Sequence, residues 1–413
     1  AEQHIFQPLG MVHSTFREPL PAALAGQMSA GHLYQGGQLR AQGFEYIHNF
    51  APAGGLSSSA TDMARFMIAH LNHGAYGAHR ILREDTARQM HSRQFSPNPY
   101  LNGWGLGFYE IYGNGRRIIA HNGGTPTFQT DLWLLPDEKV GIFLSYNTPS
   151  GSALAELLRA FMDRYYPARL PELQPPSDFA QRAAAYTGRY RANRHAYTTL
   201  DKLAVLSSDI SVAASANLLR INLGGEWSSW VEVAPDVFRR SDRGVTVAFA
   251  RDANGRVTHL LTPGAAYKLA WFETARLHLW LLGLSVLGFL LAIVNALRHW
   301  KTDRSASVTS RRAHRLAAAL GVINLLFLLG LALSLGGGIN ELVFAIPNSL
   351  RVALILPFLA LALTPAVLYY AVKTWQAPGW SRYSRVQYTI IAALSVAFLW
   401  WLYFWNLIGY RFG

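Results

Sequence analysis

The sequence of 413 residues contains no cysteine, and charged residues make up only 15% of it. The absence of cysteine excludes disulfide bridges and thiolate chemistry, and it removes cysteine usage as a guide to the cell compartment. The net charge is +13, but no basic patch with interleaved aromatic residues occurs, so we expect no nucleic-acid partner. Histidine, aspartate and glutamate do not cluster at metal-ligand spacing, and we predict neither a metal nor another cofactor.

Long apolar runs are confined to the last third of the chain. Four segments there have the roughly 20 residues that a helix needs to cross a bilayer: residues 277–297, 316–335, 352–372 and 388–408. None of them has an ionisable residue near its middle, which favours an anchor or docking bundle over a transporter or channel. Buried helices of a soluble protein remain the alternative interpretation.

The charges between these segments predict an orientation. The first connection carries six Arg and Lys residues against Asp303, and the third carries Lys373, Arg382 and Arg385. The positive-inside rule places both connections in the cytoplasm. We therefore predict a multi-pass protein of the bacterial inner membrane, with the bilayer as its partner and the N-terminal domains periplasmic or extracellular.

The middle of the chain predicts a linker followed by a β domain. Residues 167–178 are proline-rich and lack periodicity, as linkers do. Short alternating runs separated by turn residues fill residues 179–273, which predicts a small antiparallel barrel or sandwich. This segment resembles the lipocalin-like domains that often follow serine-hydrolase domains. It would be either a ligand-binding domain or a spacer packed against its neighbours.

Three motifs stand out in the first 166 residues. Residues 52–67, PAGGLSSSATDMARFM, predict a helix capped by Ser59, with Asp62 at capping-box spacing. Residues 103–108, GWGLGF, are a glycine-rich approach to a strand. Residues 115–147 have the pattern of three strands joined by turns, and His-Asn-Gly-Gly ends the first strand.

In this order, and with IFQPLGM at residues 5–11, the motifs resemble the C-terminal half of the class C β-lactamase and penicillin-binding-protein superfamily of serine hydrolases. The resemblance covers about residues 1–166. It implies an α+β half-domain, an antiparallel sheet with helices on both faces. The whole chain is then multi-domain: this half-domain, the β domain and an all-α transmembrane bundle.

The resemblance also implies roles for six residues. In this family a strand with Lys-Thr-Gly or His-x-Gly lies beside the reactive serine. Two groups would be catalytic: the His121 side chain would assist proton transfer, and the Gly124 N–H would be one of two oxyanion-hole donors. Four residues would contact the substrate: Asn122, Gly123, Thr125 and Asn147, the last near a substrate carboxylate. Thr127 departs from the family, which usually has glycine there, so we expect a narrower site or another backbone path.

Each of these residues also has a purely structural interpretation. His121 would then be an ordinary strand-end histidine. Gly123 and Gly124 would serve a hairpin turn, and Asn147 would shape a loop.

The family's nucleophile is missing from the chain. None of the five lysines has serine three residues before it, so Ser-x-x-Lys is absent. Tyr-x-Asn occurs only at residues 100–102 and 112–114, whereas the family's tyrosine precedes PLGM. We therefore expect a fragment of a membrane-anchored hydrolase acting on peptide, ester or lactam substrates, with little or no activity of its own. The alternative is a non-catalytic membrane protein that binds peptidoglycan, lipid or a protein partner.

Overall fold

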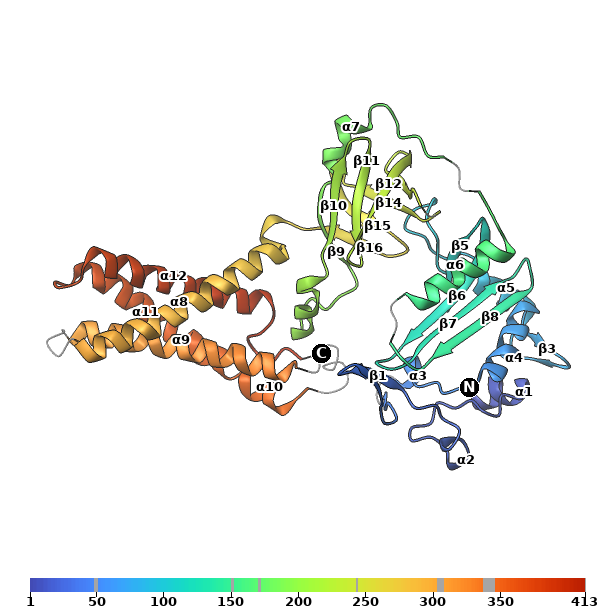
Figure 1. The fold of residues 1–413 in the computed structure, drawn as a ribbon, viewed down its shortest axis with the longest axis horizontal. Coiled ribbons are helices and arrows are strands. Elements are labelled where there is room, and N and C mark those ends of the chain that lie inside the picture. The colour runs from blue at the N-terminus through green and yellow to red at the C-terminus, as the bar shows by residue number, and fades with distance from the viewer. Residues whose placement is uncertain are drawn as a thin grey trace. The chain divides into compact units, whose positions relative to one another are not determined.

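The computed structural model describes residues 1–47, 51–149, 152–169, 172–242, 244–302, 308–336 and 346–412. The chain divides into two compact units, residues 1–187 with 212–266 and residues 188–211 with 267–413. Three architectures follow one another along the chain: a sheet with helices, a barrel and a helical bundle (Figure 1). Parts of the predicted linker (residues 170 and 171) and of the predicted bundle connections (residues 303–307 and 337–345) lie outside the described residues.

The first architecture is a four-stranded antiparallel sheet in sequence order. Its strands are β5 Tyr109–Gly113, β6 Arg116–Gly124, β7 Gln129–Leu135 and β8 Val140–Tyr146. Asn114 and Gly115 join β5 to β6 with φ of 49° and 80°, as an Asn-Gly hairpin turn requires.

Helices cover both faces of this sheet. Helix α4, Ala60–Leu71, packs Met63 and Met67 against Ile119, Leu132 and Leu134 on one face. Helix α6, Ala153–Tyr165, packs Met162 against the other face, where Ile118, Trp133 and Leu135 point. The predicted α+β fold class is confirmed.

Shorter elements complete this part of the chain. They are η1 Glu2–Phe6, α1 Gln7–Leu9, α2 Ala22–Ala25, β1 His32–Gln35, β2 Gln38–Ala41, α3 Ala51–Gly54, β3 Ala75–Tyr76, β4 His79–Arg80 and α5 Glu84–His91.

Helix α4 begins where the sequence predicts. The Ser59 hydroxyl accepts a hydrogen bond from the Asp62 N–H at 3.2 Å, which satisfies one of the free amides of the first turn. The Asp62 carboxylate is fully buried and accepts from the His13 N–H and the Ser14 hydroxyl at 2.7 and 2.9 Å. It therefore ties residues 13 and 14 to the helix start.

The β domain is a closed eight-stranded antiparallel barrel, so a barrel and not a sandwich is formed. Its strands are β9 Gly188–Ala192, β10 Ile210–Ser215, β11 Leu218–Leu223, β12 Glu226–Ala234, β13 Val237–Arg240, β14 Thr246–Arg251, β15 Val257–Leu261 and β16 Ala265–Lys268. Helix α7 Phe179–Arg182 and the 3₁₀ turn η3 Ala183–Tyr186 precede it. Phe179 and Tyr186 are buried against Phe238 and Phe249, with ring centroids 4.9–6.1 Å apart. These rings pack α7 and η3 against strands β13 and β14.

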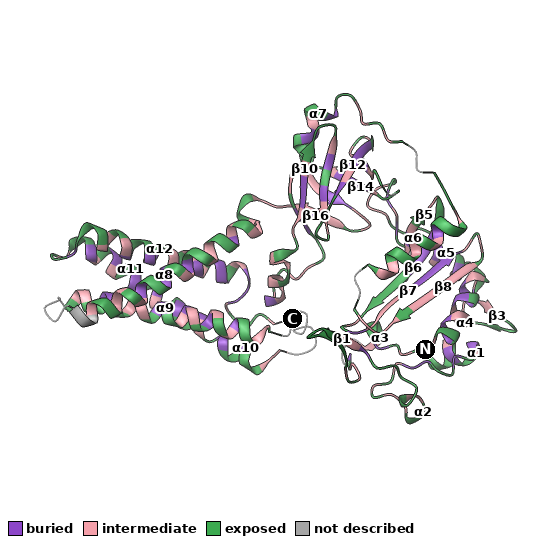
Figure 2. Ribbon diagram, viewed as in Figure 1, coloured by how far each residue is buried: buried purple, intermediate pink, exposed green. Residues whose placement is uncertain are grey.

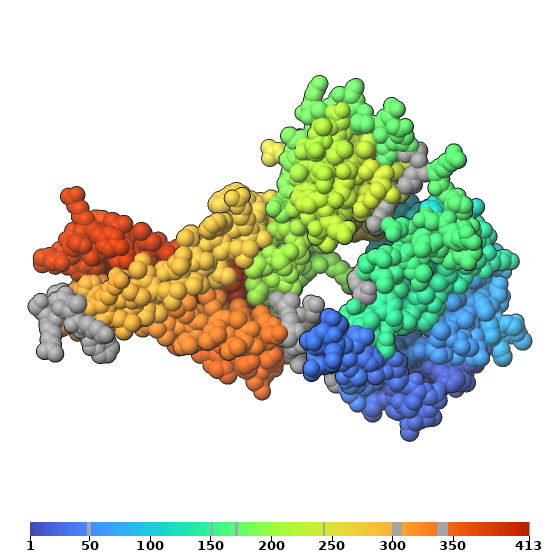
Figure 3. Space-filling view, viewed as in Figure 1, coloured from blue at the N-terminus to red at the C-terminus, as the bar shows by residue number. Residues whose placement is uncertain are grey.

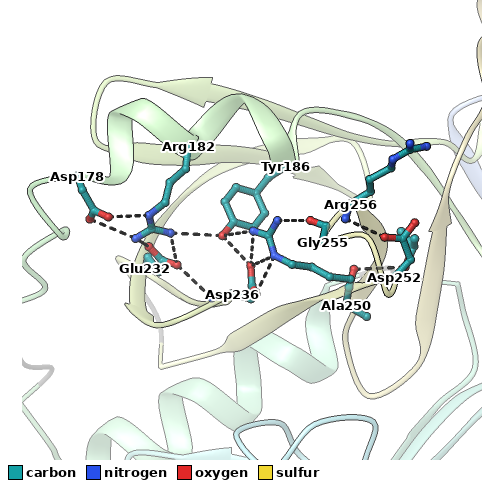
Figure 4. A network of polar contacts seen from close by, with 11 residues as sticks. Asp178, Arg182, Tyr186, Glu232, Asp236, Ala250, Asp252, Gly255 and Arg256 are labelled. Carbon is teal, nitrogen blue, oxygen red and sulfur yellow. Dashed lines mark hydrogen bonds and ion pairs between the residues drawn. The ribbon is translucent and has the colours of Figure 1, made fainter.

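A polar network borders this aromatic cluster (Figure 4). Arg182 contacts both Asp178 and the buried Glu232, and its Nη1 lies 2.7 Å from Glu232 Oε1. The Tyr186 hydroxyl donates to Asp236 at 2.7 Å, and Arg251 pairs with the same carboxylate at 2.7 Å. These residues line a cavity of about 660 Å³. Because each guanidinium is already paired, the network holds α7 and η3 on the barrel.

The C-terminal part is a bundle of long helices. They are α8 Ala275–Thr302, α9 Val308–Ser334, α11 Leu356–Gln376 and α12 Arg382–Phe404, with the short α10 Asn348–Ala353 before α11. Four spans are long and apolar enough to cross a membrane: Ala275–His299, Val308–Ser334, Asn348–Gln376 and Arg382–Phe404. Exposed residues run along all four long helices (Figure 2), as a lipid-facing surface requires.

The predicted spans differ from these helices at three places. Leu335 and residues 405–408 follow helix ends, and Asn406 has a left-handed φ of 57° that cannot continue α12. The predicted segment 352–372 is interrupted at Leu354 and Ile355, between the end of α10 and the start of α11, and Pro357 lies in the first turn of α11, where its missing N–H costs nothing. Pro365 alone lies inside α11.

The excursion between β9 and β10 is attached to the bundle. It contains the 3₁₀ segment η4 Leu200–Ser207, and the 3₁₀ turn η5 Trp271–Glu273 precedes α8. The Asn406 side chain donates to the carbonyls of Tyr197 and Thr199 at 2.9 and 3.0 Å. Lys202 donates to the Phe404 carbonyl at 2.8 Å and lies over its ring. Residues 197–209 and the end of α12 therefore form one body.

A buried histidine pair joins α4 to α5. His70 Nδ1 lies 3.1 Å from His91 Nε2, and both rings contact Phe108. Burial lowers the pKa of His70 and that of His91 to about 4 in each case. The pair is neutral at pH 7, and one ring donates to the other.

This pair makes the stability of the first part of the chain depend on pH. Between about pH 6.5 and pH 4 the unfolded chain binds protons that the folded pair does not bind. Its unfolding free energy should therefore fall as the pH falls, by up to about 1.4 kcal/mol per pH unit for each histidine. Hydrogen exchange of the α4 and α5 amides, corrected for intrinsic rates, measures this slope. The His91→Gln variant should have a shallower slope and His79→Gln, on exposed β4, the original one; an unchanged slope in His91→Gln contradicts the assignment.

Candidate active site

The end of β6 is an uncovered strand edge. Strand β5 begins opposite Ala120, so, among the described residues, residues 121–124 have a neighbouring strand on the β7 side alone. His121, Asn122, Gly123 and Gly124 are all exposed. The four residues that the sequence places in the site therefore lie in a row on an accessible edge.

The backbone of this row faces the open edge. At the turn the Thr125 N–H donates to the Phe128 carbonyl at 2.9 Å. Opposed pairs in an antiparallel ladder alternate between hydrogen-bonded and non-hydrogen-bonded. Counting back from the turn, Gly124 and Asn122 belong to the non-hydrogen-bonded pairs with β7. Their N–H and C=O groups therefore point away from β7, where an extended ligand can pair with them.

The path of the chain before β5 keeps this edge open. The Glu110 carboxylate is 2% exposed and accepts from Arg93 Nε, Arg117 Nε and the Gly103 N–H at 2.6, 2.8 and 2.9 Å. A Cβ on Gly105 would lie 2.3 Å from the Met90 carbonyl oxygen, so the glycine-rich approach allows close packing there. The Gly105 N–H donates to the Phe108 carbonyl at 2.8 Å, so the chain turns back there and enters β5 at Tyr109.

The two site glycines leave different amounts of room. The nearest heavy atom to a Cβ built on Gly123 is Thr130 Cβ at 4.0 Å, so the space over Gly123 is open. A Cβ on Gly124 would meet the flexible end of Gln129 at 3.1 Å. Neither residue has the left-handed φ that favours glycine. A hairpin turn does not explain them, because both lie within β6.

Thr125 and Asn147 have structural partners. The Thr125 hydroxyl accepts from the Phe128 N–H at 3.0 Å and closes the β6–β7 turn. Asn147 follows β8 at the same end of the sheet, and its Nδ2 donates to the Ala30 carbonyl at 2.7 Å and to the Ser29 hydroxyl at 3.0 Å. It holds the segment before β1, as its loop-shaping interpretation predicts, and its substrate role stays a prediction.

Asp131 is a residue that the sequence reasoning missed. It lies opposite Asn122 in the β6–β7 register, and its Oδ1 is buried without a hydrogen-bond partner among the described residues. Burial raises its pKa to about 6, and burial together with the Asp131 charge raises the pKa of Tyr109 to about 12. The signal was a single carboxylate inside the apolar strand QTDLWLL.

Residues 1–165 match the family model described as Beta-lactamase. This segment is a beta-lactamase-family domain. No curated protein sequence matches the chain significantly.

Several solved structures resemble the chain distantly. The crystal structure of SurE is 22% identical, with a TM-score of 0.41, and the match covers 65% of this chain and 62% of that one. The octameric penicillin-binding protein homologue from Pyrococcus abyssi is 18% identical, with a TM-score of 0.32, and the match covers 65% of this chain and 59% of that one. The penicillin binding protein from Bacillus halodurans is 18% identical, with a TM-score of 0.31, and the match covers 39% of this chain and 48% of that one. The chain thus spans about half to three fifths of these proteins.

Thr127, where the beta-lactamase family usually has glycine, is accommodated by a second glycine. Thr127 is 2% exposed, and a Cβ on Gly31 would lie 2.0 Å from its Oγ1 and 2.5 Å from its Cβ. The threonine therefore fills space that a side chain at position 31 would otherwise take. It points into this contact and does not narrow the exposed β6 edge.

This contact predicts coupling between two distant positions. Gly31→Ala should destabilise the domain through the clash, and Thr127→Gly should destabilise it by leaving a void. The loss of unfolding free energy in the double variant should be smaller than the sum of the two single losses, by about 1 kcal/mol or more. Local opening free energies of the β7 amides, from hydrogen exchange, measure this cycle. Additive effects would show that the two residues do not share one space.

Proposed function

We propose that the beta-lactamase-family domain supplies one wall of a cleft in which a serine is acylated by a peptide, ester or lactam substrate. The observation that carries this proposal is the open edge of β6, where His121 and the peptide groups of Asn122 and Gly124 are accessible together. An extended acyl substrate pairs with such an edge as an added strand.

Each site residue has a role in this chemistry. The Gly124 N–H donates to the oxyanion that forms when the serine attacks the carbonyl carbon. The His121 side chain moves a proton near the nucleophile or attracts a substrate carboxylate. Asn122, Gly123, Thr125 and Asn147 contact the substrate. Ser-x-x-Lys is absent from these 413 residues, so we expect the chain alone to form no acyl-enzyme.

The bundle anchors this domain in the bacterial inner membrane. The four candidate spans support the anchoring, and the arginine-rich ends of α9 and α12 support an orientation with those ends in the cytoplasm. The β-lactamase-family domain and the barrel then lie on the periplasmic or extracellular side.

A second function is a non-catalytic one. The absence of Ser-x-x-Lys favours a membrane protein whose domain binds peptidoglycan, lipid or a protein partner through the same edge. Labelling with a fluorescent penicillin or a fluorophosphonate distinguishes the two. We expect no labelling of residues 1–413 alone, and labelling of a natural protein that contains them together with Ser-x-x-Lys. If no such natural protein reacts, the non-catalytic function holds; a labelled serine within residues 1–413 contradicts both.

Gly123→Ala separates substrate contact from folding. A methyl group fits there without a clash and should leave the domain as stable as before, or slightly more stable. It also projects from the substrate edge, so the labelling rate of the serine-containing protein should fall at least about tenfold, the effect of about 1.4 kcal/mol. Gly43→Ala, which also has open space, is the matched control. Equal labelling rates in both variants would place the substrate elsewhere.

A further inference from the structure

A stack of aromatic rings brings two helix starts together at one end of the bundle (left in Figure 1). The His299 ring, near the end of α8, stacks on His314 of α9 with centroids 4.2 Å apart. His314 stacks on Trp380, just before α12, at 5.0 Å. The Tyr388 hydroxyl of α12 donates to the Ala313 carbonyl at 3.1 Å. The starts of α9 and α12 are therefore held beside each other.

Five arginines lie on these two helix starts. We call them the arginine end: Arg311, Arg312 and Arg315 of α9, and Arg382 and Arg385 of α12. No Asp or Glu occurs in the described residues 275–302, 308–336 and 346–412. The described part of the bundle therefore offers these guanidiniums no carboxylate partner. Figure 3 shows the helices that carry them, in orange and red, at the surface of the molecule.

The helix dipoles add to this positive charge. The first turn of a helix carries a partial positive charge, which negative groups stabilise and cations oppose. Arg311 in the first turn of α9 and Arg382 and Arg385 at the start of α12 are opposed by the dipoles, and all five arginines repel one another. An anion at two adjacent helix starts with five guanidiniums would reduce this repulsion, and helix N-termini favour anions.

Two buried donors at this end also lack partners. Trp380 is 9% exposed, and its Nε1–H has no acceptor among the described residues. Arg385 donates through Nη2 to the Ala377 carbonyl at 3.1 Å, while its buried Nε has no partner in that same part of the chain. Both donors flank Ser381, the N-cap of α12. Unsatisfied buried donors are rare in native proteins, and an unseen ligand is one explanation for them.

We propose that the arginine end is a binding site for the phosphate headgroup of an anionic phospholipid. This rests on the membrane-spanning role proposed for the bundle, because only then do the helix ends lie at the level of the headgroups. A headgroup phosphate accepts hydrogen bonds from several guanidiniums at once and neutralises both helix starts. Lipid is favoured over soluble phosphate because the flanking helix surfaces are apolar and exposed, so acyl chains pack against them.

The test uses the full chain, purified in detergent and placed in nanodiscs. Native mass spectrometry compares retention of phosphatidylglycerol with that of phosphatidylcholine, and we expect about a tenfold preference for the anionic lipid. The variant Arg311→Gln/Arg315→Gln/Arg385→Gln should reduce the preference to about twofold or less. The matched control Arg276→Gln/Arg351→Gln/Arg411→Gln, which removes three arginines elsewhere on the bundle, should keep it.

Four outcomes would overturn the proposal. The first is equal retention of the two lipids by the original chain. The second and third are an equal loss of the lipid preference in both triple variants and an unchanged preference in the first variant. The fourth is displacement of the lipid by millimolar inorganic phosphate, which indicates a small-anion site. Failure of the chain to enter nanodiscs at all would instead refute the membrane-spanning role. Size-exclusion profiles check folding of each variant, and an engineered cysteine, unique in this cysteine-free chain, checks orientation.

Discussion

The buried carboxylate of Glu110 determines the geometry of the candidate site. Glu110 is 2% exposed, and a buried charge must be paired. Its carboxylate accepts hydrogen bonds from Arg93, Arg117 and the Gly103 N–H, which lie on three different segments. Because Gly103 and Arg93 lie outside the sheet, this pairing fixes where the chain enters β5. Strand β5 consequently starts opposite Ala120, and the four residues after Ala120 on β6 keep an open edge. The accessibility of His121 and Gly124 is thus decided by an ion cluster that touches neither of them.

The sequence predicted the parts of the structure that depend on local chemistry. The Ser59 cap follows from a side chain and an amide three residues apart. The four long C-terminal helices follow from uninterrupted apolar length, and by length and composition each could cross a membrane. The barrel was predicted only as barrel or sandwich, because closure depends on pairing between the first and last strands, and no local pattern encodes that.

Contacts between distant residues decide the parts that the sequence did not reveal. Asn147 donates to Ser29, 118 residues away, so its partners are invisible to a scan of neighbouring residues. We expected Thr127 to narrow the site, but its side chain packs against Gly31, which has no side chain of its own. The sequence pattern predicted the strand that ends in His-Asn-Gly-Gly, and this strand is β6. The pattern did not predict which side chains near that strand serve the fold and which remain available to a substrate.

The two ends of the bundle balance charge in opposite ways. At the end near residue 275, Arg191 is fully buried and pairs with Asp209 at 2.7 Å, and the second oxygen of Asp209 accepts from the Ala275 N–H at 3.1 Å. A carboxylate thus meets the positive start of α8, as the helix dipole favours. At the arginine end the starts of α9 and α12 carry cations instead, and the described residues supply no carboxylate. We propose that the headgroup layer of a membrane supplies the negative charge that the described residues lack at these two helix starts.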